Sequence, residues 1–137
     1  MGVEINAVYD GGLRCTLTHG PSGSQVETDA PTDNKGKGER FSPSDLVASA
    51  LATCILTTIG IAAEGRGWDV SGMRIKVTKE MSSTPPRRIA RLPIELWMAH
   101  DMPEEGRQQV ERIAHACPVQ RSLNESIEFS VTIHWPT

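Results

Sequence analysis

The strongest constraint on the fold of this 137-residue chain is a run of eighteen residues, 46–63, without a charged side chain. A helix of this length must be considered as a candidate membrane span. The run also contains many alanines and four hydroxyl side chains, those of Ser49, Thr53, Thr57 and Thr58. That composition favours a helix surrounded by the core of a soluble protein. One sheet covers only one side of such a helix, so we expect a second helix or the second subunit of a homodimer to cover the rest.

Signals for a helix beginning and a helix end flank this run. Ser42 is the predicted N-cap, Pro43 the first helical residue, and Asp45 stands at the third position, where a capping box usually has Glu. Gly65 or Gly67 suits the left-handed position that follows a helix. The sequence therefore predicts one long helix from Pro43 to these glycines.

Six segments in which apolar and polar residues alternate predict six strands. Three of them lie within residues 3–29, separated by turns at residues 10–12 and 20–23. The other three are residues 69–79, 88–100 and 126–135. The polar residues 29–40 predict a long surface loop.

A second helix is predicted to begin near Asp101 and Pro103. It places an apolar stripe on one face at Val110, Ile113, Ala114 and Cys117. Pro118 ends this helix and can begin a short third helix through Leu123. The order of three strands, helix, two strands, helix and strand predicts an α+β fold, because no regular βαβ alternation is present.

Charge and cysteine content exclude several classes of protein. The 14 basic and 17 acidic residues give a net charge of −3, which provides no basic surface for nucleic acid. An odd number of cysteines, three, argues against a secreted disulfide scaffold. The first residues lack the basic and apolar regions of a signal peptide. We expect a cytoplasmic protein that acts without a membrane.

Two of the three cysteines occupy positions at which a reactive thiol has to be considered. Cys54 is in the middle of the long helix, where a free cysteine is usually a small buried apolar side chain. Cys117 continues the apolar stripe of the second helix, but it is also the N-cap candidate of the third. Free backbone N–H groups at a helix start stabilise an anion, so this position predicts a lowered pKa for the Cys117 thiol. Cys15 follows the first turn and is assigned no chemistry.

The residues around these two thiols carry a resemblance. FSPSDLVASALATC, residues 41–54, and HACPVQRSL, residues 115–123, together resemble the OsmC/Ohr family of organic hydroperoxide reductases. The resemblance covers essentially the whole chain, as a single OsmC-like domain of residues 1–137. It implies an antiparallel six-stranded sheet, a long buried central helix and an intertwined homodimer.

The resemblance also implies an activity. Cys54 would be the peroxidatic thiolate that attacks an organic hydroperoxide, leaving a sulfenic acid and releasing an alcohol. Cys117 would then form a disulfide with it, and an external thiol or dithiol would reduce that disulfide. No metal or organic cofactor is implied. This thiol peroxidase would serve the response to oxidative stress.

A thiolate in the middle of a helix gains little from the helix dipole and is expected to need a nearby cation. Arg14 matches the position at which Ohr-like members carry an activating Arg, and Arg40 is a second candidate; either can instead be a solvated arginine. Ohr-like members have Glu directly after the helix-opening Pro, where this chain has Ser44 followed by Asp45. Asp45 is therefore either a helix cap or the partner of an arginine, and the chain resembles the broader OsmC-like branch.

A non-catalytic function is the alternative. The same dimeric fold with two buried thiols would then hold a small apolar ligand at the subunit interface. Thiol reactivity distinguishes the two hypotheses, because only catalysis requires a reactive thiolate. A Cys-His hydrolase is disfavoured, since no histidine stands where the sequence predicts a base for either cysteine.

Overall fold

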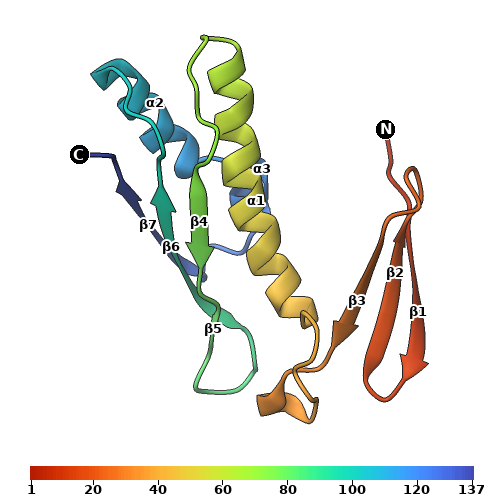
Figure 1. The fold of residues 1–137 in the computed structure, drawn as a ribbon. Coiled ribbons are helices and arrows are strands. Elements are labelled where there is room, and N and C mark those ends of the chain that lie inside the picture. The colour runs from red at the N-terminus through yellow and green to blue at the C-terminus, as the bar shows by residue number, and fades with distance from the viewer. The chain divides into compact units, whose positions relative to one another are not determined.

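The structure is a computed structural model that describes residues 1–137, and it consists of two compact units, residues 1–46 and 47–137 (Figure 1). The boundary falls in the first turn of the long helix α1, Pro43–Glu64. That residues 1–137 form a single domain stays a prediction.

The first unit is a three-stranded antiparallel sheet in the order β1-β2-β3. Its strands are β1 (Ile5–Gly11), β2 (Arg14–His19) and β3 (Gln25–Asp29), as the alternation predicted. Gly11 and Gly12 have φ angles of 87° and 62° in the β1–β2 turn, a conformation that favours glycine. A short 3-10 helix, η1 (Thr32–Asn34), interrupts the predicted loop after β3.

The sheet β1–β3 has no apolar core of its own. The buried residues of the first unit are polar, namely Thr28, Asp29 and Ser42. Most of its large apolar side chains are exposed, among them those of Val3, Ile5, Val8, Tyr9, Leu13, Val26 and Phe41. Three strands need a covered apolar face for stability, so this sheet requires a surface that buries these side chains.

The predicted capping box begins α1. The backbone N–H of Asp45 donates to Ser42 Oγ over 3.1 Å, and the backbone N–H of Ser42 donates to Asp45 Oδ2 over 2.9 Å. These reciprocal bonds satisfy two backbone donors that the helix itself leaves free. Gly67, with φ of 69°, follows the helix end in the left-handed conformation.

The second unit contains a four-stranded sheet and two further helices. Its elements after α1 are β4 (Arg74–Val77), β5 (Glu80–Met81), β6 (Ile89–Trp97), α2 (Glu104–Ala114), α3 (Pro118–Ser122) and β7 (Glu128–His134). Strand β6 pairs antiparallel with β4 and β5 and parallel with β7. Helices α2 and α3 confirm the predicted second and third helices.

The expectation of one antiparallel six-stranded sheet is wrong. The chain has seven strands in a three-stranded and a four-stranded sheet, and one pairing, that of β6 with β7, is parallel. Parallel strands need a long connection that returns the chain to the same end of the sheet. Helices α2 and α3 provide it, so β6, these helices and β7 form the crossover that the sequence pattern did not reveal.

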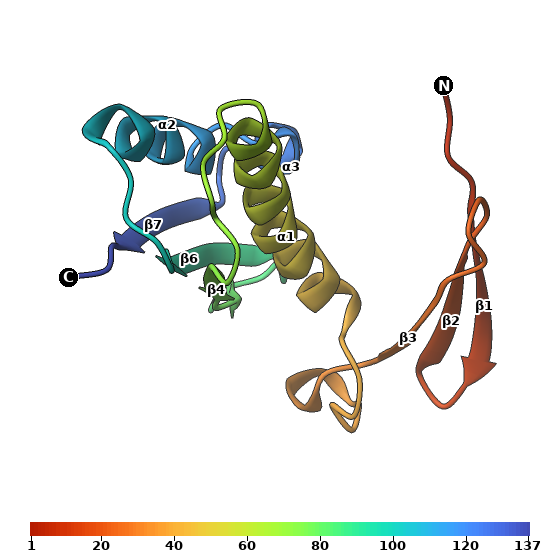
Figure 2. The same cartoon turned by 45° about the horizontal axis from the view of Figure 1, so that its top comes forward.

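The core of the second unit lies between this sheet and the helices. Figure 2 shows the second-unit part of α1 together with α2 over the same face of β4, β6 and β7. Strand β6 contributes alternate side chains, Leu92, Ile94 and Leu96, and α1 contributes one stripe, chiefly Leu51, Ile55 and Ile59. Each of these side chains is at most 2% exposed. Burial at this density makes them the main apolar stabilisation of the unit.

Helix α1 is buried along one side only. Its opposite side is exposed at Ala50, Thr53, Thr57 and Ile61, of which Ile61 is 67% exposed. By length and composition α1 could cross a membrane. Its buried stripe, however, is that of a core helix, and the exposed side is the one for which the sequence predicted another cover.

Candidate active site

The structure brings Cys54 and Cys117 together within the second unit. Cys54 lies in the middle of α1, and Cys117 is the residue that precedes the first turn of α3. Both thiols are free, and each shifts the pKa of the other. Cys54 is partly exposed, whereas Cys117 is fully buried. One sulfur is therefore accessible to a substrate and the other is not.

The surroundings of Cys54 lower the pKa of its thiol. Burial acts to raise this pKa, but hydrogen bonds from the backbone N–H of Val119 and from the Cys117 thiol outweigh it. The Thr58 hydroxyl adds the smallest contribution, since its proton is bonded to the carbonyl oxygen of Cys54 over 2.7 Å and its Oγ1 lies 3.9 Å from the sulfur. Hydrogen bonds donated to the anion favour the thiolate, and the thiolate is the nucleophilic form of cysteine.

Val119 is a donor because of the way α3 begins. Cys117 occupies the N-cap position, and Pro118, the first helical residue, has no N–H. The backbone N–H of Val119 is consequently the first free donor of the helix start. This N–H lowers the pKa of Cys54 and, as the smallest effect there, that of Cys117.

The expectation of a lowered pKa at Cys117 is wrong. Burial raises the pKa of this thiol, the bond with Cys54 raises it further, and the backbone N–H of Gln120 compensates only in part. The side chain of Cys117 makes no capping bond to α3. Desolvation outweighs the favourable helix start here because the sulfur is 0% exposed. Cys117 thus keeps its proton over the pH range in which the Cys54 thiol begins to ionise.

An open hollow of about 490 Å³ lies against Cys54. Its lining comes from the exposed side of α1 and from the start of α3, and consists of Ala50, Thr53, Cys54, Thr57, Thr58, Ile61, Pro118 and Val119. Most of these side chains are apolar or carry only a hydroxyl, and none has a charge. Such a surface suits an uncharged, largely apolar molecule at the sulfur.

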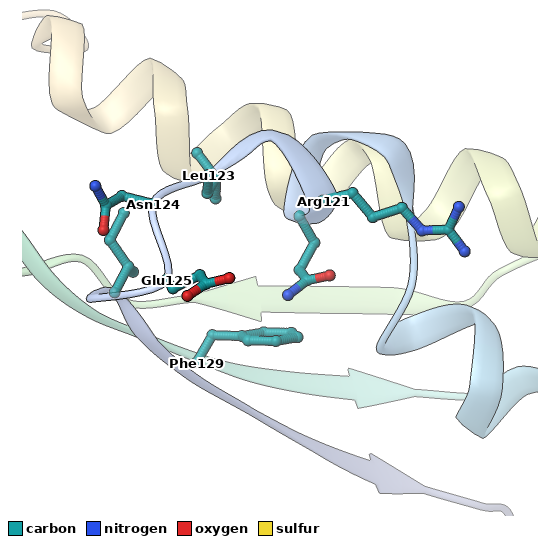
Figure 3. Close-up of a pocket in the computed structure, with 7 residues that line it drawn as sticks. Arg121, Leu123, Asn124, Glu125 and Phe129 are labelled. Atoms are coloured by element: carbon teal, nitrogen blue, oxygen red, sulfur yellow. The ribbon is translucent and has the colours of Figure 1, made fainter.

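A second hollow, of about 510 Å³, lies between the end of α3 and β7 (Figure 3). It is lined by Gln120, Arg121, Leu123, Asn124, Glu125, Ile127 and Phe129. Neither cysteine belongs to this lining. This hollow therefore does not open onto the thiol pair.

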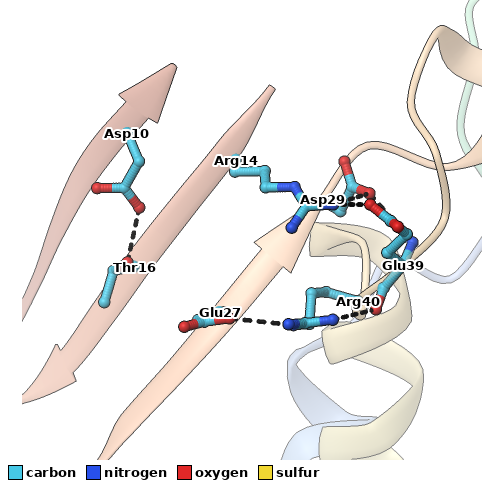
Figure 4. Close-up of polar contacts among 7 residues, drawn as sticks. All are labelled: Asp10, Arg14, Thr16, Glu27, Asp29, Glu39 and Arg40. Carbon is cyan, nitrogen blue, oxygen red and sulfur yellow. Dashed lines mark hydrogen bonds and ion pairs between the residues drawn. The ribbon is translucent and has the colours of Figure 1, made fainter. Parts of the chain in front are cut away.

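The two candidate arginines lie in the first unit, each in an ion pair (Figure 4). Arg14 pairs with Glu39 and with Asp29, the latter over 3.5 Å. Arg40 pairs with Glu27 over 3.0 Å. That Arg14 or Arg40 activates Cys54 stays a prediction.

Asp29 anchors the Arg14 cluster. Its side chain is 1% exposed, and its Oδ2 accepts the backbone N–H of Glu39 over 3.0 Å. This bond is the largest of the effects that lower the pKa of the Asp29 carboxyl; burial opposes it and the charge of Arg14 adds to it. An ionised Asp29 therefore holds both the end of the 30–40 loop and the guanidinium of Arg14.

Asp45 and Cys15 also belong to the first unit. Asp45 caps α1, as described above, and its pairing with an arginine at an active site stays a prediction. Cys15 lies in β2 opposite Tyr9 and Thr28, and is a free thiol.

Sequence reasoning missed Val119 as the donor to Cys54. The signal was present in the sequence, since a Cys-Pro pair at a helix start leaves the following residue with the first free N–H. The sequence does not show which of the two sulfurs this N–H affects most. That depends on how α1 and α3 pack.

Comparison with known proteins shows which family the chain matches. The model of the OsmC-like protein family matches residues 36–132. A solved structure from Psychrobacter arcticus 273-4, named for an osmotic stress and detoxification response, is 38% identical in sequence. It covers 95% of this chain and 94% of its own, with a TM-score of 0.90. No protein with a curated description matches the chain.

More distant structures share the fold. An OsmC-like protein from Mycoplasma pneumoniae is 18% identical, covers 98% of this chain and 97% of its own, and has a TM-score of 0.80. The organic hydroperoxide resistance protein OhrB of Bacillus subtilis is 15% identical, covers 97% and 98%, and has a TM-score of 0.70.

The fold and the site define an α+β protein in which a long helix holds one thiol against a second, buried thiol. The family match extends over more than half of the sequence, and the Psychrobacter structure aligns along nearly its whole length. The chain belongs to the OsmC-like protein family. Its fold is that of a soluble protein.

Proposed function

We propose that this protein is a thiol-dependent peroxidase that reduces organic hydroperoxides to alcohols through Cys54. The observation that carries the proposal is the asymmetry of the thiol pair. Cys54 is accessible from an uncharged hollow and has a lowered pKa, whereas the neighbouring Cys117 is buried and stays protonated. Structural neighbours named organic hydroperoxide resistance proteins have the same fold.

The proposed reaction begins with the Cys54 thiolate. Its sulfur attacks the distal oxygen of the hydroperoxide, the O–O bond breaks, and the alkoxide leaves as an alcohol after taking a proton from water. Sulfur is oxidised to a sulfenic acid and the peroxide is reduced. The Cys117 thiol then condenses with this sulfenic acid, forming a disulfide and releasing water. An external thiol or dithiol reduces the disulfide by exchange and restores the pair.

The proposal includes a homodimer in the cytoplasm. Sheet β1–β3 has no buried apolar side chain, and α1 leaves Ile61 and its neighbours exposed. A second copy of the chain would bury such surfaces, which soluble proteins seldom expose over a large area. The expected mass in solution is about twice the 14.9 kDa of one chain. A monomer in light scattering would contradict this part of the proposal.

Activation of Cys54 by a cation is a further part of the proposal. Arg14 is the first candidate, because Asp29 and Glu39 hold its guanidinium in place. Arg40 is the second. Arg14→Met and Arg40→Met separate them, since only the activating arginine should slow peroxide consumption while the fold is kept.

Mass spectrometry after one equivalent of cumene hydroperoxide tests the reaction. The expected product is a disulfide between Cys54 and Cys117 within one chain, and Cys54→Ser should abolish peroxide consumption. Cys117→Ser should instead accumulate a sulfenic acid on Cys54 that dimedone traps. Cys15→Ser is the matched control and should behave like the wild type. Full activity of Cys54→Ser would refute the assignment, and cysteines inert to alkylation at neutral pH would favour the ligand-binding alternative.

A further inference from the structure

Thr58 lies one helical turn after Cys54 and lines the same hollow. Its Oγ1 is 3.9 Å from Cys54 Sγ. The same hydroxyl donates its single proton to the carbonyl oxygen of Cys54 over 2.7 Å. This short bond holds the proton on the helix backbone, so the lone pairs of Oγ1 remain available to a donor that enters the hollow.

The 3.9 Å between Thr58 Oγ1 and Cys54 Sγ suits a hydroperoxide. An O–H donor lies about 2.8 Å from its acceptor oxygen, and a reacting atom lies about 3 to 3.5 Å from its nucleophile before attack. An oxygen at both distances closes a triangle whose third side is the observed 3.9 Å. A molecule whose terminal oxygen is both a donor and an electrophile can therefore bridge Thr58 and the sulfur of Cys54.

We infer that Thr58 is a further catalytic residue, whose Oγ1 accepts the O–H of the hydroperoxide and holds its distal oxygen against Cys54 Sγ. The inference rests on the proposed peroxidase function and adds to it the group that orients the substrate. As the sulfur attacks, the O–O bond breaks and the distal oxygen keeps its hydrogen. It becomes the hydroxyl of the Cys54 sulfenic acid, still within reach of Thr58.

Thr53 provides a matched control in the same helix. It lies one residue before Cys54 and also lines the hollow. Its hydroxyl donates to the carbonyl oxygens of Ser49 and Ala50, over 2.8 and 3.3 Å, and so makes the same type of backbone bond as Thr58. Thr53→Val and Thr58→Val therefore remove equivalent backbone bonds and nearly equal volumes, but only the second removes a hydroxyl beside the sulfur.

The test compares Thr58→Val, Thr58→Ser and Thr53→Val with cumene hydroperoxide as substrate and dithiothreitol as reductant. We expect kcat/KM of Thr58→Val to be about tenfold below that of Thr53→Val, the loss expected for one hydrogen bond that orients a substrate. Thr58→Ser, which keeps the hydroxyl, should restore most of the rate. The pH profile of Cys54 alkylation by iodoacetamide should shift only slightly in Thr58→Val, by much less than the roughly tenfold loss of peroxidase rate. Thr58 makes the smallest contribution to the lowered pKa of Cys54, and this reagent has no hydroperoxide group to orient.

Three results would overturn the inference. Equal kcat/KM values for Thr58→Val and Thr53→Val, with an active wild type, would show that the hydroxyl holds no substrate and would leave the peroxidase function standing. An alkylation rate that falls as much as the peroxidase rate would show that Thr58 acts on the thiol and not on the peroxide. A wild-type protein that consumes no hydroperoxide would refute the proposed function and this inference with it.

Discussion

Removal of the Val119 N–H is the sharpest test of how Cys54 is activated. Replacing Val119 by the corresponding α-hydroxy acid changes one peptide bond into an ester, which deletes the donor and keeps the side chain. Because this N–H is among the groups that lower the pKa of the Cys54 thiol, its loss should raise that pKa. Val119→Ala, which keeps the N–H and shortens the side chain, is the control.

The size of the effect follows from the kind of bond. A hydrogen bond to a charged group contributes about 1.5 to 3 kcal/mol, and about 1.4 kcal/mol corresponds to a factor of ten. Cys54 is partly exposed, so water replaces part of the lost bond and the lower end of this range applies. At a pH below the pKa, the thiolate fraction should therefore fall about tenfold in the ester variant.

Alkylation by iodoacetamide measures this fraction, since only the thiolate reacts. The assay is run on Cys15→Ser protein with the labelled peptide identified by mass spectrometry, so that Cys54 is read by itself. The ester variant should label about tenfold more slowly near neutral pH and at the wild-type rate once the pH exceeds both pKa values. Labelling within twofold of the wild type at every pH would refute the role of Val119.

Three further outcomes are expected. Peroxide consumption should rise with pH to a plateau, with a midpoint below the ordinary thiol pKa of 9.0, because the pKa of Cys54 is lowered; a midpoint above 9.0 in a rate-against-pH series would contradict it. Ser42→Ala should lower the free energy of unfolding by about 1 kcal/mol in urea, since it removes the hydroxyl that caps α1. The lowered pKa of Asp29 stabilises the fold above the ordinary value of 3.8, and this contribution is lost as the pH falls through the lowered pKa. Asp29→Asn should therefore unfold at a lower temperature at pH 7, with the difference disappearing in acid; an equal difference at both pH values would exclude the charge as its cause.

Local signals made most of the fold predictable. Ser42, Pro43 and Asp45 identified the beginning of α1, because a capping box involves only neighbouring residues. The exposed side of α1 was also predictable, since one sheet cannot surround an uncharged helix. The parallel pairing of β7 with β6 was not, because strand direction depends on where a connection of some thirty residues returns the chain.

The two cysteines of the candidate site could be singled out from the sequence, but their electrostatics could not. The sequence singled out both cysteines, but it assigned the lowered pKa to Cys117 from its place at a helix start. Burial reverses that assignment, because desolvation of a fully buried sulfur outweighs the nearby backbone donors. Burial depends on how α1, α3 and the sheet pack, which no short segment of sequence specifies.

The different roles proposed for Cys54 and Cys117 follow from these surroundings. The pKa of Cys54 is lowered and that of Cys117 is raised, so Cys54 is the sulfur that ionises first. When neighbouring groups have pKa values shifted in opposite directions, their roles separate. Cys54, the sulfur with the lowered pKa, is also the one that the hollow exposes, so in the proposed reaction a hydroperoxide meets the nucleophile first. The opposite assignment would require a substrate to reach a sulfur that is fully buried. In the proposed reaction Cys117 therefore keeps its proton until a sulfenic acid forms on its neighbour, and resolves it without contact with the solvent.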